Sequence, residues 1–439
     1  MKTFKYFPHT EEDIKKMLKV IGASSLDDLF KVVPKEIQEK AKIDLPATLN
    51  EHELTENMTK ISNMNYDLEI YRGAGAYNHY TPSIIPYLVQ RSEFLTSYTP
   101  YQPEISQGTL QYIFEFQSMI ARLTGLDVAN ASMYDGATST AEAVLMASNQ
   151  SSHKKVLVSS TINPNIVEVI KTYAHYQDIE IVMIPEQKGY TDFEFIRKSD
   201  NYSAVVVQNP NYYGLVEDYT NFSDEIHAKG GLFIMNNDPL ALAIIKSPGE
   251  LGVDIATGDG QPLGIPLSFG GPYVGYIATT KKMLRRIPGR IVGVTNDSSG
   301  KRGFVLTLQA REQHIRRCRA TSNICSNQSL MALWVTIYLS LMGSDGLIKV
   351  NELSYTNSHY LHDKLLATGY FEPVYDTNFI KEFTLKAKFD PKVVESKLLA
   401  KGYLFGLPLQ NNKVLFAVTE KLNKEKIDKF VEVLENVLQ

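Results

Sequence analysis

Residues 204–238, AVVVQNPNYYGLVEDYTNFSDEIHAKGGLFIMNND, contain two apolar runs separated by a mainly polar stretch. The runs AVVVQ (204–208) and LFIMN (232–236) are nearly continuously apolar and contain β-branched residues, which is typical of strands covered on both faces. The pattern between them predicts a helix near residues 220–229. Because parallel strands are joined by crossovers of this kind, the stretch predicts a strand–helix–strand unit of a parallel sheet.

The same alternation continues on both sides of this unit. Further strands are expected at 156–159, at 179–185, near 254 and near 273, and a further helix near 163–176. Together they predict an α/β fold with a mostly parallel, about seven-stranded sheet and flanking helices. After a long helical region at 327–367, the strands FEPVY, IKEFTLKA and KVLFAVTE alternate with two amphipathic helices. This order predicts a small C-terminal α+β domain.

The length of 439 residues is too great for one ordinary core. We expect three parts: an N-terminal helical arm with an aromatic interface segment (1–106), a large α/β domain (107–330) and a small α+β domain (331–439). The content of 44% hydrophobic and 21% charged residues is that of a folded, soluble protein. The net charge of −4, without long runs of like charge, gives no reason to expect a nucleic-acid partner.

The beginning of the sequence has no signal-peptide pattern, and no run of eighteen apolar residues occurs. Cys318 and Cys325 are too few for a disulfide scaffold, and their spacing matches no structural zinc site. These features predict a cytoplasmic protein without membrane insertion. The histidines have no metal-binding spacing, and His314, among several arginines, is more typical of a solvated helix face than of a catalytic group.

The segment YDGATSTAE (134–142) predicts the start of an alanine-rich helix, at which Ser139 and Glu142 have the spacing of a capping box. Free N–H groups at a helix start can bind a phosphate, but a capping box needs no ligand. Asp238 has two interpretations as well. A carboxylate at the end of a strand can keep the nitrogen of a pyridoxal ring protonated, whereas Asp followed by Pro239 is also an ordinary helix start.

The loop GDGQPLGIPLSFGGP (258–272) is not a nicotinamide site, because its glycines have the wrong spacing and Pro262 interrupts the helix that should follow. A pyridoxal-phosphate enzyme would need a lysine that holds the cofactor aldehyde as a Schiff base. None occurs from Ser247 to Thr280, where that lysine is expected. The sequence therefore predicts a chain that is built like a catalyst and depends on a partner subunit. A stand-alone pyridoxal enzyme that uses Lys246 or Lys281 is the disfavoured alternative.

Several long motifs resemble the glycine cleavage system P-protein family, and in particular its first subunit. They are YRGAGAYNHYTP (71–82), SYTPYQPEISQGTLQ (97–111), YDGATSTAEA (134–143), GDGQPLGIPLSFGGP (258–272), and REQHIRR (311–317) with ATSNICSNQ (320–328). The resemblance implies a fold-type-I, pyridoxal-phosphate-dependent transferase fold. It also implies that no cofactor is bound covalently by this chain, since pyridoxal phosphate and the Schiff-base lysine belong to subunit 2.

The resemblance further implies an oxidoreductase subunit that is inactive alone. In a heterotetramer of two plus two chains, the enzyme would decarboxylate glycine and transfer the aminomethyl group to the lipoyl arm of the H-protein. Gly136, Ala137, Thr138 and Asp238 would be remnants of a cofactor pocket. Residues that could reach the partner's active site would be Arg72, Tyr98, Tyr101, Gln102 and Glu104. A purely structural scaffold subunit, whose tyrosines only pack an interface, is the alternative.

Overall fold

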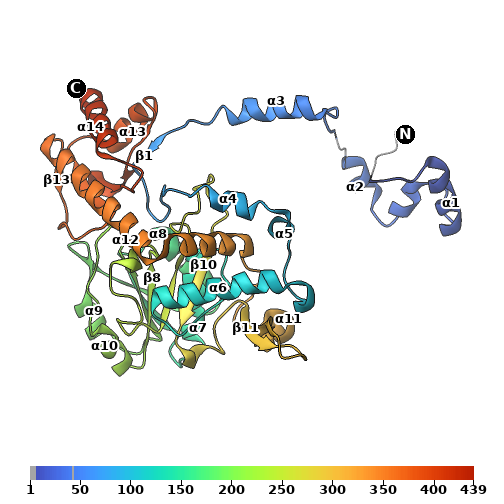
Figure 1. Ribbon diagram of the computed structural model, residues 1–439, viewed down its shortest axis with the longest axis horizontal. Coiled ribbons are helices and arrows are strands. Elements are labelled where there is room, and N and C mark those ends of the chain that lie inside the picture. Colours follow the sequence, from blue (N-terminus) through green and yellow to red (C-terminus); the bar gives the residue numbers. More distant parts are fainter. Residues whose placement is uncertain (1–5, 42–43) are drawn as a thin grey trace. The chain divides into compact units, whose positions relative to one another are not determined.

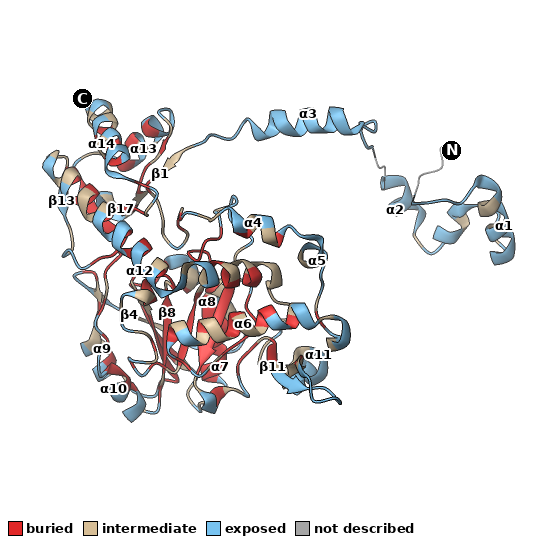
Figure 2. Ribbon diagram, viewed as in Figure 1, coloured by how far each residue is buried: buried red, intermediate tan, exposed pale blue. Residues whose placement is uncertain are grey.

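The computed structural model describes residues 6–41 and 44–439. The chain divides into two compact units, residues 1–66 and 67–439. The first unit consists of α1 (Glu11–Ile21), η1 (Leu26–Phe30), α2 (Lys35–Lys40) and α3 (Glu51–Ser62) (Figure 1). No residue of these four helices is buried (Figure 2). The three-part division expected at residues 106 and 330 stays a prediction.

The second unit is built on a seven-stranded sheet with the strand order β2-β10-β9-β8-β7-β3-β4. Its strands are β2 (Val128–Ala129), β3 (Lys155–Ser159), β4 (Glu180–Ile184), β7 (Ala204–Asn209), β8 (Leu232–Asn237), β9 (Ile255–Asp259) and β10 (Gly275–Thr279). The five strands from β9 to β4 pair in parallel, whereas β10 is antiparallel to both of its neighbours. The predicted mostly parallel sheet is confirmed.

Helices cover both faces of this sheet, and β3 shows why its sequence is continuously apolar. The helices are α6 (Gln107–Thr124), α7 (Gly136–Ser148), α8 (Pro164–His175), α9 (Phe193–Lys198) and α10 (Phe222–Ala228). Val156 and Val158 belong to the core cluster that contains residues of α7 and α8. Leu157 belongs to the opposite cluster, which contains residues of α9 and α10. Since successive side chains of a strand point to opposite faces, both faces must be apolar.

A capping box is present at the start of α7, but it is formed by Asp135 and Thr138, so the expectation that Ser139 and Glu142 form it is wrong. The helix begins at Gly136, and Asp135 is its N-cap, whose carboxylate accepts a hydrogen bond from the N–H of Thr138 at 2.7 Å. Ser139 and Glu142 therefore lie inside the helix, where both are buried. An acidic side chain three residues before Thr138 competes well for the first free N–H groups.

The C-terminal part confirms the small α+β arrangement. It comprises α12 (Ser329–Ala367), β13 (Phe371–Pro373), β14 (Glu382–Ala387), α13 (Pro391–Leu399), β15 (Tyr403–Leu404), β16 (Leu407–Pro408), β17 (Lys413–Ala417) and α14 (Lys424–Leu438). The strands β13, β14, β17 and β16 form an antiparallel sheet. An unexpected strand, β1 (Glu69–Ile70), pairs in parallel with β15, so the chain near residue 70 is attached to this part.

Short elements connect these layers. They are α4 (Ile84–Val89), α5 (Ser92–Leu95), η2 (Pro103–Ile105), β5 (Glu186–Gln187), β6 (Tyr190–Thr191), η3 (Ala241–Ala243), η4 (Lys281–Met283), β11 (Ile291–Asn296), β12 (Arg302–Thr307), η5 (Gln309–Arg311), α11 (Gln313–Arg316), η6 (Arg317–Arg319) and η7 (Gln410–Asn412). The helix start considered at Asp238 and Pro239 is not formed, because only the short turn η3 follows it.

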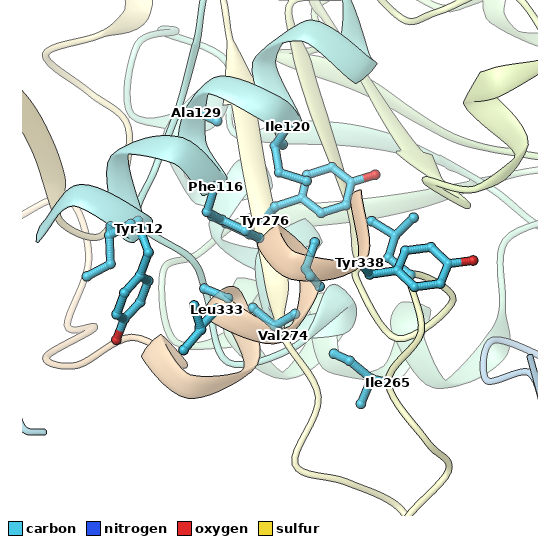
Figure 3. Close-up of a cluster of buried hydrophobic side chains, with 14 of the residues drawn as sticks. Tyr112, Phe116, Ile120, Ala129, Ile265, Val274, Tyr276, Leu333 and Tyr338 are labelled. Carbon is cyan, nitrogen blue, oxygen red and sulfur yellow. The ribbon is translucent and has the colours of Figure 1, made fainter. Parts of the chain in front are cut away.

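The first half of α12 packs with α6 against β10 (Figure 3). Phe116 and Ile120 of α6, Tyr276 of β10, and Leu333 and Tyr338 of α12 are all buried in this cluster. By length and hydropathy alone α12 could cross a membrane, but the core helix of a soluble protein meets the same two criteria. Its backbone is interrupted at Gly343, which has a φ of 57°, and its buried side chains belong to the cores of this unit. We therefore interpret α12 as a core helix.

Candidate functional site

A cavity of about 260 Å³ opens at the carboxyl ends of the central parallel strands. Gln208 is the penultimate residue of β7, Asp238 follows β8, and Asp259 ends β9. The remaining walls come from the starts of α7 and α8, from residues 73–77 and from residues 380–382. Ligands of open α/β sheets bind at this edge of the sheet. The cavity is therefore the candidate site.

The first turn of α7 forms one wall of the cavity, and its N–H groups are partly used by the chain itself. The N–H of Gly136 donates to Oδ2 of Asp259 at 3.0 Å, and the N–H of Gln261 donates to Oδ1 of the same carboxyl at 2.9 Å. Burial raises the pKa of Asp259 to about 7, in spite of these hydrogen bonds. The carboxyl of Asp259 thus occupies the helix start that could otherwise bind a phosphate.

Asp238 forms another part of the wall and binds a lysine from a distant segment. Nζ of Lys381 lies 2.6 Å from Oδ2 of Asp238, and the two side chains are 6% and 10% exposed. Lys381 comes from the C-terminal part, directly before β14, whereas Asp238 follows β8 of the large sheet. The other oxygen of Asp238 accepts the N–H of Leu240 at 3.0 Å. Both oxygens of Asp238 therefore have partners within the chain.

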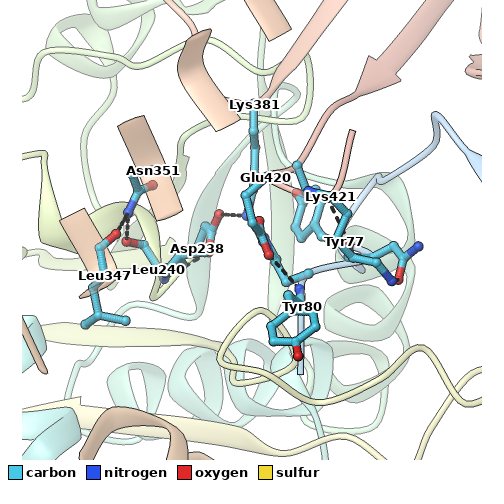
Figure 4. A network of polar contacts seen from close by, with 12 residues as sticks. Tyr77, Tyr80, Asp238, Leu240, Leu347, Asn351, Lys381, Glu420 and Lys421 are labelled. Atoms are coloured by element: carbon cyan, nitrogen blue, oxygen red, sulfur yellow. Dashed lines mark hydrogen bonds and ion pairs between the residues drawn. The ribbon is translucent and has the colours of Figure 1, made fainter. Parts of the chain in front are cut away.

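A short network holds Lys381 in this position (Figure 4). Its ammonium lies 3.8 Å from the ring centroid of Tyr77, which is a cation–π contact, and 3.1 Å from Nε2 of His79. Nδ1 of His79 lies 2.7 Å from Glu420. Burial and the charge of Lys381 lower the pKa of His79, so its ring is neutral at pH 7. The neutral ring can then accept from Lys381 and donate to Glu420.

Glu382, next to Lys381, ties residues 73–77 to the same wall. It accepts the hydroxyl of Tyr77 at 2.6 Å and the N–H of Ala74 at 2.7 Å. Burial raises the pKa of Glu382 to about 7, although these two hydrogen bonds oppose the rise. The cavity wall therefore has two buried carboxyls that titrate near neutrality, Glu382 and Asp259.

The residues expected to be remnants of a cofactor pocket do not all line the cavity. Gly136, Ala137 and Asp238 line it, whereas Thr138 lies outside it and is bonded to Asp135. The lysines of the stand-alone alternative lie elsewhere: Lys246 is exposed and bonds to Thr220, and Lys281 is exposed as well. Within the described part of the chain, Lys381 is the only lysine in the lining.

The residues expected to reach a partner's site lie away from the cavity lining. Tyr98, Gln102 and Glu104 are exposed in the segment around η2. Tyr101 is exposed as well, but its hydroxyl accepts a hydrogen bond from Arg290 at 3.0 Å, and the guanidinium lies 5.1 Å from its ring centroid. Their role in catalysis stays a prediction.

Arg72 lies apart from that segment, in contact with the C-terminal part. It is paired with Glu395 and donates to the carbonyl of Phe405 at 3.1 Å. These partners give it a structural role in the connection between residues 71–79 and the small sheet. Whether it also reaches a partner's site stays a prediction.

Sequence reasoning missed three side chains that line the cavity, Asp259, Lys381 and Glu382, and two that hold Lys381 in place, His79 and Glu420. One signal was present, because the predicted strand IKEFTLKA has two adjacent charged residues near its start, Lys381 and Glu382. Charged residues are rarely buried without a partner, so a charged start of a core strand indicates an internal ion pair.

Known proteins of one family match nearly the whole chain. The family model of the glycine cleavage system P-protein matches residues 4–434. The probable glycine dehydrogenase (decarboxylating) subunit 1 of Listeria innocua is 46% identical over 448 residues and is matched over 100% of both chains. The protein of the same description from Desulforamulus reducens is 48% identical, covering 97% of this chain and 98% of that one.

Solved structures show which known fold this chain shares. A crystal structure of glycine decarboxylase (P-protein) of the glycine cleavage system, in inhibitor-bound form, superposes with a TM-score of 0.93, at 43% identity, over 99% of this chain and 100% of that chain. The sphingosine-1-phosphate lyase of Burkholderia pseudomallei is 14% identical, has a TM-score of 0.66 and covers 91% of this chain and 92% of its own. The latter likeness concerns the fold alone, which is that of fold-type-I pyridoxal-phosphate-dependent enzymes.

Proposed function

Because the chain belongs to the glycine cleavage system P-protein family, as its first subunit, we propose that it acts only together with a second subunit that supplies the Schiff-base lysine. The observation that carries the proposal is the absence of any lysine from Ser247 to Thr280, the segment that runs through β9 and β10 beside the cavity. The lysine that does line the cavity, Lys381, is already paired with Asp238.

In the proposed assembly the partner holds pyridoxal phosphate, which serves as an electron sink when glycine loses carbon dioxide. The aminomethyl group then passes to the lipoyl arm of the H-protein. The contribution of this chain is to bind the partner and to shape the entrance of the partner's site. The name of its relatives as subunit 1 supports a two-chain enzyme of the oxidoreductase class. We further propose a heterotetramer of two plus two chains in the cytoplasm.

The surface around α4, α5 and η2 supports contact with a partner chain. Seven large apolar or aromatic side chains are exposed along residues 80–105. They are Tyr80, Ile84, Tyr87, Leu95, Tyr98, Tyr101 and Ile105. Exposed apolar residues that gather in one segment mark interaction surfaces. The segment is therefore the proposed interface with subunit 2.

A scaffold subunit without side chains in the partner's site is the second candidate. The hydrogen bond from Arg290 to the Tyr101 hydroxyl favours it, because this hydroxyl already has a partner within its own chain. In that case the exposed segment would only pack against subunit 2.

The test is to reduce the purified two-subunit enzyme with borohydride and to locate the pyridoxyl group by mass spectrometry, while glycine–bicarbonate exchange is measured for each subunit alone and for the mixture. We expect the pyridoxyl-lysine only in subunit 2, and exchange only in the mixture. A stoichiometric pyridoxyl-lysine in this chain, or exchange by this chain alone, would contradict the proposal.

A further inference from the structure

The cavity lining has two features that could bind pyridoxal phosphate, the start of α7 and the carboxyl of Asp238, but side chains of this chain already occupy both. A phosphate would bind at the start of α7, where the carboxyl of Asp259 accepts the N–H of Gly136. A pyridine nitrogen would bind to Asp238, where Lys381 lies at 2.6 Å. An acid therefore stands in the place of the phosphate, and a cation in the place of the protonated ring nitrogen.

We propose that Asp259 and Lys381 together form an internal plug, which occupies the start of α7 and the carboxylate of Asp238 and excludes pyridoxal phosphate from this chain. The inference deepens the proposed function and rests on it in one respect, namely that the cofactor belongs to subunit 2. The missing lysine prevents only the covalent bond, and a phosphorylated pyridine can bind without one. The proposal assigns the exclusion of non-covalent binding to Asp259 and Lys381.

The charges explain why the plug excludes the ligand. A phosphate ester carries between one and two negative charges at pH 7 and would be repelled by the ionised form of Asp259, whose pKa of about 7 leaves it partly ionised at that pH. The ligand would therefore have to displace the buried carboxyl of Asp259 from the N–H groups of Gly136 and Gln261. The ligand would also have to displace the ammonium of Lys381 from the carboxylate of Asp238. His79 and the ring of Tyr77 hold this ammonium in place.

Two amide side chains of the lining are hydrogen-bonded within the chain. Asn163 accepts the N–H of Asn165 and donates to the carbonyl of Ala74, and Gln208 accepts the N–H of Asn163 and donates to the carbonyl of Pro210. These bonds fix this part of the wall, whereas the buried Oδ1 of Asn237 in the same lining has no hydrogen-bond partner among the described residues.

The plug can be tested by removing it and measuring whether a non-covalent ligand binds. The probe is pyridoxamine 5′-phosphate, which has the phosphate and the pyridine nitrogen but no aldehyde, so it cannot react with lysines. The full chain is used in complex with subunit 2, whose own cofactor has been fixed by borohydride reduction. Titration calorimetry then reports only new sites. Exchange activity of the unreduced preparation tests the proposed function separately.

We expect no binding to the wild-type chain. The double variant Asp259→Ala/Lys381→Met should bind one probe molecule per chain, with an affinity at least about tenfold above the wild-type limit. Pyridoxamine without phosphate and inorganic phosphate should each bind more weakly than the probe. The matched control is Glu372→Ala/Lys388→Met, which removes the same charges from an exposed pair at the surface; it should not bind.

Binding of the probe by the wild-type chain at one equivalent would overturn the proposal. So would an assembled double variant that binds no more tightly than the control. If the double variant does not fold, the single variant Asp259→Ala decides, because it opens the helix start while Lys381 still neutralises Asp238. It should gain binding of inorganic phosphate, and failure to do so would refute the phosphate half of the plug.

Discussion

Both side chains of the Lys381–Asp238 pair are almost fully buried. The stability of the folded chain is therefore sensitive to the loss of either one. Lys381→Met would leave the carboxylate of Asp238 in a water-poor wall without its cation. Removal of one partner of a buried ion pair costs about 3–5 kcal/mol of folding free energy. We expect a loss of this size in chemical denaturation, and a much smaller loss in Lys381→Met/Asp238→Asn, where no charge is left unpaired. Equal losses in the two variants would contradict a direct coupling.

Glu382 should make stability depend on pH, since its pKa is about 7 in the folded chain and 4.5 is its ordinary value. Between these values the folded state holds a proton that the unfolded state has lost, so stability falls as the pH rises through this window and is constant above it. The difference corresponds to about 3 kcal/mol. Relative to the wild type, Glu382→Gln should therefore gain about this amount between about pH 4.5 and about pH 8.

Denaturation midpoints at the two pH values measure this gain. The control Glu372→Gln changes a half-exposed carboxyl of the small sheet and should follow the wild type at both pH values. A Glu382→Gln variant with the same pH dependence as the wild type would show that this carboxyl is ionised throughout.

The sequence allowed part of the site to be predicted for a physical reason. Gly136 and Asp238 were identified because a helix start and a strand end have local signals, and parallel strands bring such positions to one edge. Lys381 and Glu420 were not identified, because each binds a residue that is far away along the chain: Asp238 and His79. Only the packing of the C-terminal part on the large sheet brings these groups together, and no local pattern encodes it.

The packing of β10 against the start of α7 should tolerate no side chain at Gly275. A Cβ atom there would overlap with the carbonyl oxygen of Asp135 and with Oγ of Ser139. Overpacking of this kind typically costs about 1–3 kcal/mol. We therefore expect Gly275→Ala to lower the unfolding free energy by this amount. Gly108→Ala is the matched control, because Gly108 lies in α6 with nothing near its Cβ position, and alanine favours helices. Equal stability of the two variants would contradict the close packing.

Elements with one clear hydrophobic pattern were predicted well, whereas a helix start that depends on a single capping side chain was not. Six of the seven strands of the sheet lie within about two residues of their expected positions, whereas the two-residue strand β2 was not expected. The start of α7 was placed four residues too late, because Asp135 and Ser139 have equally good capping chemistry and only the structure shows which one is used. The hairpin of β11 and β12 was missed, because its two strands are mostly half-exposed and only weakly apolar.

Variants of residues 98–104 test whether this chain contributes side chains to the partner's active site or only packs against the partner. If Tyr101 and Glu104 reach the partner's site, Tyr101→Phe and Glu104→Gln should slow glycine–bicarbonate exchange while the complex stays assembled. The loss of one well-placed polar contact in a closed site costs about 2–4 kcal/mol in the transition state, or roughly 30- to 1,000-fold in rate. The measurement is exchange at saturating subunit 2, with assembly followed by size-exclusion chromatography.

A packing role gives a different result, because the loss of a packing contact weakens assembly and the activity returns at high subunit concentration by mass action. Tyr101→Phe also removes the acceptor of the Arg290 guanidinium, whereas Glu104→Gln leaves that contact intact. A rate loss in both variants therefore indicates contact with the partner's site, and a loss in Tyr101→Phe alone indicates that Arg290 has moved. Tyr176→Phe, an exposed tyrosine after α8, is the control and should keep the wild-type rate. If both variants assemble and exchange at the wild-type rate, the scaffold function replaces the contributing one.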